Sequence, residues 1–209
     1  MIAPTDTRQR FALYRLLIAG VMLLTVNACA LVAVGAIVVT GSAVHDRRSV
    51  ETVVDDRLLN IAVRDALYGS DAFGNESRIK ISAFNGWVLL AGEAVSEEHV
   101  AEATELVSGV KGLKKLFNEL APEPPASLAQ ASRDRLLSLQ AKSAVADIKD
   151  MPRFDASRVK ITTARGNVYL QGLLTQAEGA RVVEQVRYVN GVEQVVVLFE
   201  WVESPDAQS

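Results

Sequence analysis

Two short stretches of the chain share one alternating pattern of hydrophobic and polar positions. Each consists of a glycine, five residues and a second glycine, over residues 86–92 and 166–172. Valine and leucine occupy the same alternate positions in both copies, which is typical of a β-strand with a buried face, and the bounding glycines mark turns. A second alternating run with a basic first residue, at 78–81 or 158–161, precedes each stretch. The pattern therefore predicts two β-hairpins.

The similarity between the two copies extends beyond the hairpins. Asn85-Gly86 and Arg165-Gly166 occupy the predicted turns, and Asn-Gly is a strong hairpin signal because both residues tolerate positive φ. Gly86 and Gly166 lie 80 positions apart, and Gly112 and Gly191, before the next strands, lie 79 apart. A repeat of this length indicates a duplicated domain, because the units of solenoid proteins are shorter, at roughly 20–50 residues.

The sequence of each copy predicts the order helix, strand, strand, helix, strand. The first helices are expected at about 50–68 and 128–149, and the last strands at about 114–120 and 195–201. A hairpin is antiparallel, whereas the second helix permits a crossover to a parallel strand. The sequence thus predicts an α+β protein of two tandem α-β-β-α-β domains, each with a three-stranded mixed sheet and two helices on one face.

Hydrophobic residues at three- and four-residue steps predict which side of each first helix is buried. In the first domain this predicted core stripe is Val54, Leu58, Ile61 and Ala62. In the second domain it is Leu137, Ala141, Ala144, Val145 and Ile148. Each domain has only about 70 residues, near the lower limit for independent folding, so packing between the domains is expected to matter for stability.

The N-terminal segment has the layout of an export signal. Arginines precede an apolar run, Leu16 to Val26, and Ala28 stands before the single cysteine, Cys29. This resembles a bacterial lipoprotein signal, in which small residues precede the cysteine that receives the lipid. It predicts a signal peptide over residues 1–28, with lipidated Cys29 beginning a tether that runs to residue 49.

An uncleaved transmembrane helix is the alternative interpretation of the same segment. Apart from Asn27, residues 16–44 are apolar or small, a run longer than the roughly 20 residues that span a bilayer. Both interpretations place the folded domains outside the cytoplasm.

Composition argues against several classes of function. The formal net charge of −3 does not provide the basic footprint of a general nucleic-acid binder. Two histidines, His45 and His99, are too few for a histidine-based metal cluster, and no nucleophile-elbow motif is present. The sequence therefore predicts no enzyme, no metal and no cofactor.

The helix at 128–149 carries leucines that its predicted core stripe does not use. Leu136 and Leu139 lie three positions apart, and Arg133, Arg135 and Lys142 flank them. Apolar tips ringed by cations suit the headgroup region of an anionic membrane. These five residues are the candidate phospholipid-binding site.

The corresponding helix of the first domain has the opposite charge. It carries Glu51, Asp55, Asp56 and Asp65, which an anionic membrane would repel. A plainer interpretation of the second helix stays open on the residues alone. In it, the two leucines are buried against the other domain and the cations form a solvated face.

The repeated pattern resembles that of the BON domain. A basic residue and Val or Ile, then Gly-x-Val-x-Leu-x-Gly, a helix, and glycine before a strand recur over 78–119 and 158–199. Together with the N-terminal signal, the whole chain resembles the dual-BON outer-membrane lipoproteins. The resulting boundaries are residues 50–120 for the first BON domain, 121–127 for a proline-rich linker, 128–203 for the second domain and 204–209 for a tail.

The resemblance implies a non-catalytic protein, lipid-anchored in the outer membrane with its domains in the periplasm. It implies binding of anionic phospholipid through the first helix of the second domain, support of outer-membrane integrity and enrichment at the division site. The expected partners are an anionic phospholipid membrane and envelope proteins, not nucleic acid. The alternative function is a periplasmic protein-interaction scaffold held by an uncleaved N-terminal membrane helix.

Overall fold

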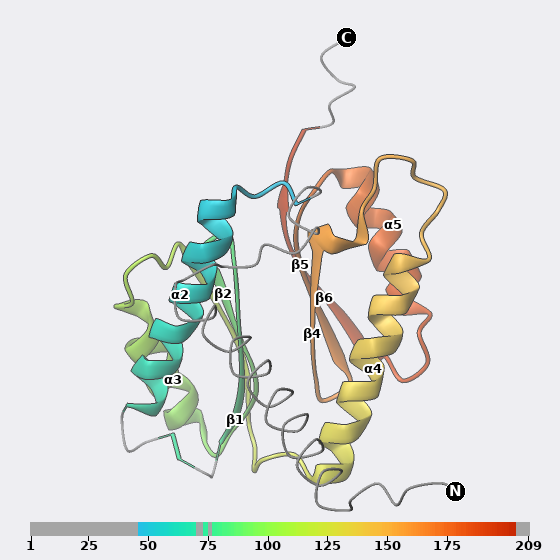
Figure 1. Ribbon diagram of the computed structural model, residues 1–209. Helices are drawn as coiled ribbons and strands as arrows, with labels where there is room; N and C mark the ends of the chain where they lie inside the picture. Colours follow the sequence, from blue (N-terminus) through green and yellow to red (C-terminus); the bar gives the residue numbers. More distant parts are fainter. Residues whose placement is uncertain (1–45, 70–72, 75–76, 204–209) are drawn as a thin grey trace, which may run out of the picture. The chain divides into compact units, whose positions relative to one another are not determined.

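The structure, a computed structural model, describes residues 46–69, 73, 74 and 77–203 (Figure 1). Cys29 and the predicted signal segment lie outside the described residues. All of the described residues belong to one compact unit, Gly41–Ser209. Both helix-covered cores fall between Leu59 and Phe199, so a fragment of residues 41–209 retains them complete.

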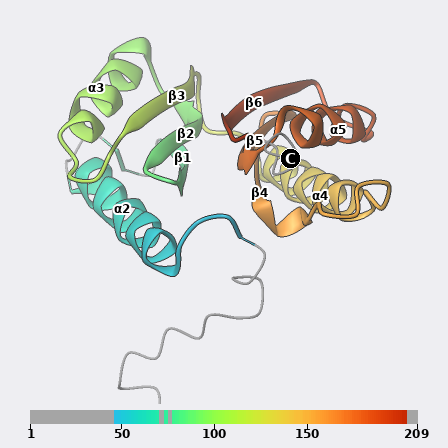
Figure 2. The same cartoon turned by 90° about the horizontal axis from the view of Figure 1, so that it is seen from above.

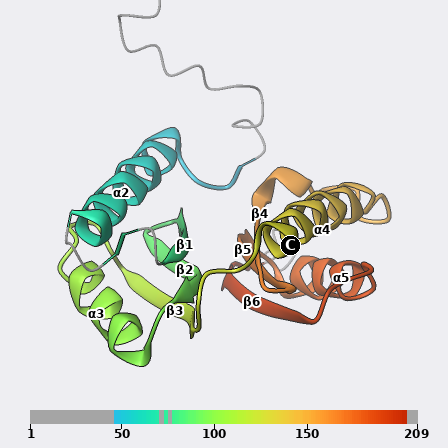
Figure 3. The same cartoon turned by 90° about the horizontal axis from the view of Figure 1, so that it is seen from below.

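The described elements repeat one order twice. They are α2 (Val50–Tyr68), β1 (Arg78–Phe84), β2 (Trp87–Ala94), α3 (Glu97–Ser108) and β3 (Lys115–Pro122), then α4 (Leu128–Ala146), a 3₁₀ turn η3 (Ala156–Arg158), β4 (Val159–Ala164), β5 (Asn167–Leu174), α5 (Gln176–Arg187) and β6 (Gln194–Trp201). In each sheet the hairpin pair is antiparallel and the last strand is parallel to the central one. Figure 2 and Figure 3 show α2 and α3 on one face of the first sheet, and α4 and α5 on one face of the second. The predicted fold class is confirmed.

The buried stripe of α2 differs from the predicted one. Leu59, Val63 and Leu67 are buried, whereas Leu58 and Ile61 are more than half exposed and Val54 and Ala62 are half-buried. Asp56, three positions before Leu59, is also buried. Because one position of the buried stripe is a carboxylate, the hydrophobic residues alone do not show the true helical period. The predicted stripe is therefore displaced by about one position from the observed one.

The buried stripe of α4 agrees with the prediction. Leu137, Ala141 and Val145 are buried, and Ile148 packs on the same core just after the helix ends. The helix ends at Ala146 rather than near residue 149, because Asp147 is the C-cap. The equivalent buried residues of α2 lie 78 positions earlier, so the two helices present the same face to their sheets.

A buried aspartate joins the first helix of each domain to its hairpin turn. In the first domain the Asp56 carboxylate accepts hydrogen bonds from the backbone N–H groups of Asn85 (2.7 Å) and Gly86 (2.8 Å). These two residues have φ of 50° and 78°, as a type I′ turn requires. Burying a carboxylate is unfavourable unless its hydrogen bonds are made, and here the turn supplies them.

The second domain repeats this arrangement. Asp134 accepts from the backbone N–H groups of Arg165 (3.0 Å) and Gly166 (3.2 Å), which have φ of 54° and 74°. Gln130 adds a third hydrogen bond to the carboxylate at 3.1 Å. The aspartate thereby holds a non-glycine residue in a left-handed conformation that the backbone alone disfavours.

The sheet faces that the helices leave uncovered pack against each other. Leu89 and Ala91 of β2 form one cluster with Ala164, Tyr169 and Leu198 of the second domain. Val88 and Leu90 point to the helices instead, so β2 is buried on both faces. Packing between the domains, which their small size led us to expect, therefore forms a third hydrophobic core.

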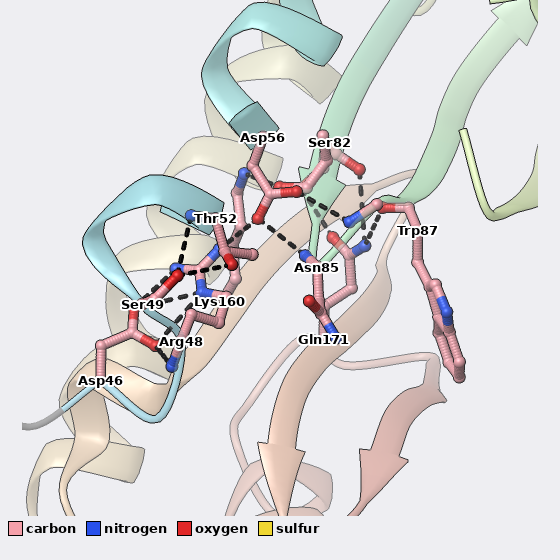
Figure 4. Close-up of polar contacts among 12 residues, drawn as sticks. Asp46, Arg48, Ser49, Thr52, Asp56, Ser82, Asn85, Trp87, Lys160 and Gln171 are labelled. Atoms are coloured by element: carbon pink, nitrogen blue, oxygen red, sulfur yellow. Dashed lines mark hydrogen bonds and ion pairs between the residues drawn. The ribbon is translucent and has the colours of Figure 1, made fainter. Parts of the chain in front are cut away.

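Two polar contacts across this interface are reciprocal. The Lys80 ammonium donates to the carbonyl of Thr163, and Lys160 donates to the carbonyl of Ala83 at 3.0 Å. Each partner lies 80 positions from its counterpart, which is the contact pattern of an isologous dimer contained in one chain. Between them, the buried Ser82 hydroxyl donates to Gln171 Oε1 at 2.6 Å (Figure 4).

We predict that Asp134→Ala lowers the free energy of unfolding of the 41–209 fragment by about 2–4 kcal/mol. The substitution leaves two turn N–H groups without their acceptor, each at a cost of about 1–3 kcal/mol. Urea unfolding followed by circular dichroism measures the change. Gln140→Ala, at an exposed position of the same helix, is the control. A loss within about 0.5 kcal/mol of that control would contradict the assigned role.

Candidate functional site

The leucines proposed for membrane contact lie on the outer surface of α4. Leu136 is 57% exposed and Leu139 is 60% exposed, and the flanking Arg133, Arg135 and Lys142 are also exposed. Burial of the leucines against the first domain, the plainer alternative, is therefore wrong. We refer to these five residues as the cationic face of α4.

Helix geometry brings the members of the cationic face together. Arg133, Leu136, Leu139 and Lys142 follow one another at three-residue steps, and Arg135 precedes Leu139 by four. Residues at these separations are neighbours on a helix surface. The two leucines thus have a cation at each end of their row and another at the side.

The charges of the cationic face are not cancelled within α4. Its only acidic residue is Asp134, which is 3% exposed and is occupied by the hairpin turn. Arg133 is held through its guanidinium to Gln130 Oε1 at 2.6 Å. Within the described residues, no carboxylate lies within ion-pairing distance of Arg135 or Lys142. The exposed side of the helix therefore carries three cations.

Leu128, which the sequence analysis did not select, extends the cationic face. It is the first residue of α4 and is 79% exposed. It precedes Arg135 by seven positions and Leu139 by eleven, separations that return to the same side of a helix. This spacing is visible in the sequence and could have identified Leu128 as part of the same surface.

The same pair of exposed apolar positions occurs on α2 with a different charge. Leu58 and Ile61 lie 78 positions before Leu136 and Leu139 and are 59% and 56% exposed. Asp55 stands where α4 has Arg133, and Glu51 and Asp65 are also exposed, whereas Arg57 and Arg64 keep a cation at the positions of Arg135 and Lys142. Asp56, counted in the sequence as another repelling acid, is buried and bound to the hairpin, so it does not belong to that surface. Charge, more than hydrophobicity, distinguishes the two helices.

The last residues of the predicted tether are fixed on both domains. The Arg48 guanidinium pairs with Asp56 of the first domain at 2.7 Å (Figure 4). It also lies 3.8 Å from the centre of the Phe84 ring in the same domain. The Arg47 guanidinium pairs with Glu178 at 2.6 Å and donates to the carbonyl of Leu173 at 2.8 Å, both in the second. We refer to residues Asp46–Ser49 as the strap.

Glu178 is the carboxylate at the second-domain end of the strap. It completes a capping box at the start of α5 and also pairs with Arg158 at 3.1 Å. Burial raises the pKa of this carboxyl, but hydrogen bonds from Arg47 and from the Thr175 backbone N–H outweigh burial and hold the pKa below its usual value. The strap is therefore bound to an ionised group at neutral pH.

Three further observations concern metal ligands, membrane spans and His99 in the part of the chain that the structure describes. Those residues contain no group of three His, Cys, Asp or Glu side chains placed to hold a metal ion. Among the described helices, none combines the length and apolar character needed to cross a bilayer. His99 Nδ1 contacts the hydroxyl of its own helix N-cap, Ser96, at 2.9 Å, and the ring packs on Phe73.

Comparison with known proteins gives matches along most of the chain. The BON domain model matches residues 55–121 and 139–203. The outer membrane lipoprotein DolP of Haemophilus influenzae is 30% identical over 84% of this chain and 89% of its own length. The 21 kDa hemolysin of Actinobacillus pleuropneumoniae is 31% identical over 76% of this chain and 80% of its own.

A solved structure of CdsD, a structural protein of the type III secretion system of Chlamydia trachomatis, also aligns. It covers 71% of this chain and 94% of the solved one, with 12% identity and a TM-score of 0.25. At that score the alignment adds nothing to the fold derived above.

We predict that Arg47→Ala lowers the free energy of unfolding of the 41–209 fragment by about 1–2 kcal/mol at pH 7, because a charge-assisted hydrogen bond is lost. Since the folded-state pKa of Glu178 is lowered, its contribution is complete above the unfolded value of about 4.3 and disappears as the pH falls through the folded-state pKa. The difference from the parent should therefore shrink well below pH 4.

Urea unfolding of parent and variant at pH 7 and at about pH 3 tests this linkage. Lys149→Ala removes a cation from an exposed position and serves as the control, with little change expected at either pH. An Arg47→Ala difference of equal size at both pH values would mean that Glu178 ionisation does not hold the strap.

Proposed function

The chain belongs to the BON-domain family, and from that premise we propose that it is a lipid-anchored outer-membrane protein that binds anionic phospholipid through the cationic face of α4. It is a DolP-like BON protein, and this family is non-catalytic. The observation that carries the lipid-binding proposal is the pair of exposed leucines surrounded by three cations with no exposed acid in the helix.

The energetics of the cationic face suit a membrane surface. Each Lys or Arg near an anionic bilayer contributes about 1 kcal/mol, so Arg133, Arg135 and Lys142 together contribute about 3 kcal/mol. Leu136 and Leu139 add the transfer of exposed apolar area into the interface, at about 25 cal/mol per Å². The equivalent surface of α2 has the apolar pair but also Asp55, so it should bind weakly.

Lipid attachment at Cys29 would hold the domains near the membrane, so that a modest affinity of the cationic face for phospholipid is enough for binding. Sixteen residues separate Cys29 from Asp46, and a fully extended segment of that length reaches roughly 55 Å. Anchoring turns docking of α4 into an intramolecular event with a high effective concentration. With this anchor we propose periplasm-facing domains that support outer-membrane integrity, including at the division site.

We predict that Leu136→Glu weakens binding of the 41–209 fragment to phosphatidylglycerol vesicles by at least about tenfold. The change removes an apolar contact and adds a charge that the membrane repels. Co-sedimentation with vesicles at low salt measures binding, and raising the salt should weaken the parent because the cations are screened.

Leu58→Glu is the matched control, since Leu58 has the equivalent position in α2 and nearly the same exposure. It should bind as the parent does. Unchanged binding of Leu136→Glu would remove the cationic face as the lipid site. Absence of any vesicle binding by the parent would favour the scaffold alternative, in which this face docks an envelope protein.

We also predict that the mature protein begins at Cys29 and carries acyl chains there. Mass spectrometry of the N-terminal peptide from membranes is the measurement. Cys29→Ser should yield no lipidated peptide. Recovery of an unprocessed peptide from the parent, containing residues before Cys29, would instead indicate an uncleaved membrane helix.

A further inference from the structure

A groove of about 610 Å³ lies where the two domains meet, between α2 and the β4 and α4 elements. Its apolar wall comes from both domains and includes Val53, Ile61, Phe84, Val159 and Ile161. Its volume is in the range of sites that hold small ligands. The groove exists only because the two sheets pack together.

The charged residues of the groove are mostly cationic. Arg48, Arg57, Lys142 and Lys160 line it, against a single carboxylate, Asp56. Asp56 is already occupied, because it accepts from the hairpin turn and pairs with Arg48. Within the described residues, no carboxylate lies within ion-pairing distance of the other three cations.

Lys160 is the cation most deeply placed in the groove. It is half-buried, and its one described hydrogen bond is to the carbonyl of Ala83 at 3.0 Å. An ammonium has three donors, so two remain for another acceptor. Burial lowers the pKa of Lys160, the nearby Arg48 guanidinium lowers it further, and the Asp56 carboxylate only partly opposes them. A bound anion would offset both effects.

Lys80, the counterpart of Lys160 in the first domain, has different charged neighbours. Lys80 makes the reciprocal bond, to the carbonyl of Thr163, but it also has the Asp134 carboxylate 3.9 Å away. Asp56 is the corresponding carboxylate near Lys160 and acts to raise its pKa, but Asp56 is already paired with Arg48 at 2.7 Å. Among the described residues, no arginine pairs with Asp134 in this way. The arginine beside Lys160 is not needed for packing of the two sheets, because the lysine-to-carbonyl bond across the interface is the same in both copies.

We propose that the groove is a binding site for one phosphate group, whose oxygens accept hydrogen bonds from Lys160, Arg57 and Lys142. A phosphate offers several acceptor oxygens and matches donors that converge from three separate elements. The apolar wall would contact whatever carbon chain the phosphate carries. The site shares only Lys142 with the cationic face of α4, and phosphate binding does not require that face to bind a membrane.

The test is titration of the 41–209 fragment, observed by backbone amide NMR, with three probes. These are inorganic phosphate, glycerophosphoglycerol and a short-chain phosphatidylglycerol below its micelle concentration. We expect saturable shifts at Ala83, Phe84 and Ile161. Comparable binding of the first two probes would identify a free-phosphate site, and tighter binding of the lipid would identify a headgroup site that also uses the apolar wall.

Lys160→Gln should weaken binding at least tenfold, and Lys80→Gln, which loses the same type of interface bond, should leave it unchanged. Arg57→Gln removes an exposed cation and should weaken binding several-fold, so the proposal stays testable if Lys160→Gln fails to fold. Absence of saturable shifts with all three probes would overturn the proposal. Equal losses for Lys80→Gln and Lys160→Gln would also overturn it.

Discussion

The hydrogen bonds from a hairpin turn to a buried aspartate fix the rotation of the first helix in each domain. Asp134 must face the Arg165-Gly166 turn, and Asp56 must face the Asn85-Gly86 turn. Since successive residues of a helix are 100° apart, this orientation also determines which residues point outward. Leu136 is therefore exposed for the same reason that Asp134 is buried. The surface proposed to bind lipid is a consequence of how the helix is attached to its sheet.

The fold was largely predictable from the sequence because both copies repeat the same alternation, glycines and turns. The buried stripe of α2 was not predictable, because Asp56 interrupts the hydrophobic period at a buried position. The strap was not predictable either. The partners of Arg47 and Arg48 lie up to 131 positions away, and pairing over such a separation leaves no local pattern. On α4, by contrast, the surplus leucines could be recognised because Leu137 and Ala141 already accounted for the core.

Packing of the two sheets limits where this protein can bind anything. In each domain the helices cover one sheet face and the other domain covers the second, so β2 and β5 are enclosed from both sides. A ligand or partner can therefore bind only at the exposed surfaces of the helices or in the groove beside the interface. The repeated apolar pair on α2 and α4 belongs to this remaining surface, and selection could change its charges without disturbing either core.

Two charge differences between the copies add positive charge to the surfaces proposed to bind an anion. Arg133 replaces Asp55 of α2 at the same helix position, and Arg48 pairs with the aspartate near Lys160, whereas among the described residues no arginine pairs with the aspartate near Lys80. Both differences increase the positive potential around α4 and the groove, although the chain as a whole has a net charge of −3. Folding does not require this asymmetry, because the aspartate-to-turn and lysine-to-carbonyl bonds are retained in both copies. An anionic ligand accounts for both differences at once, since it would gain from each added cation.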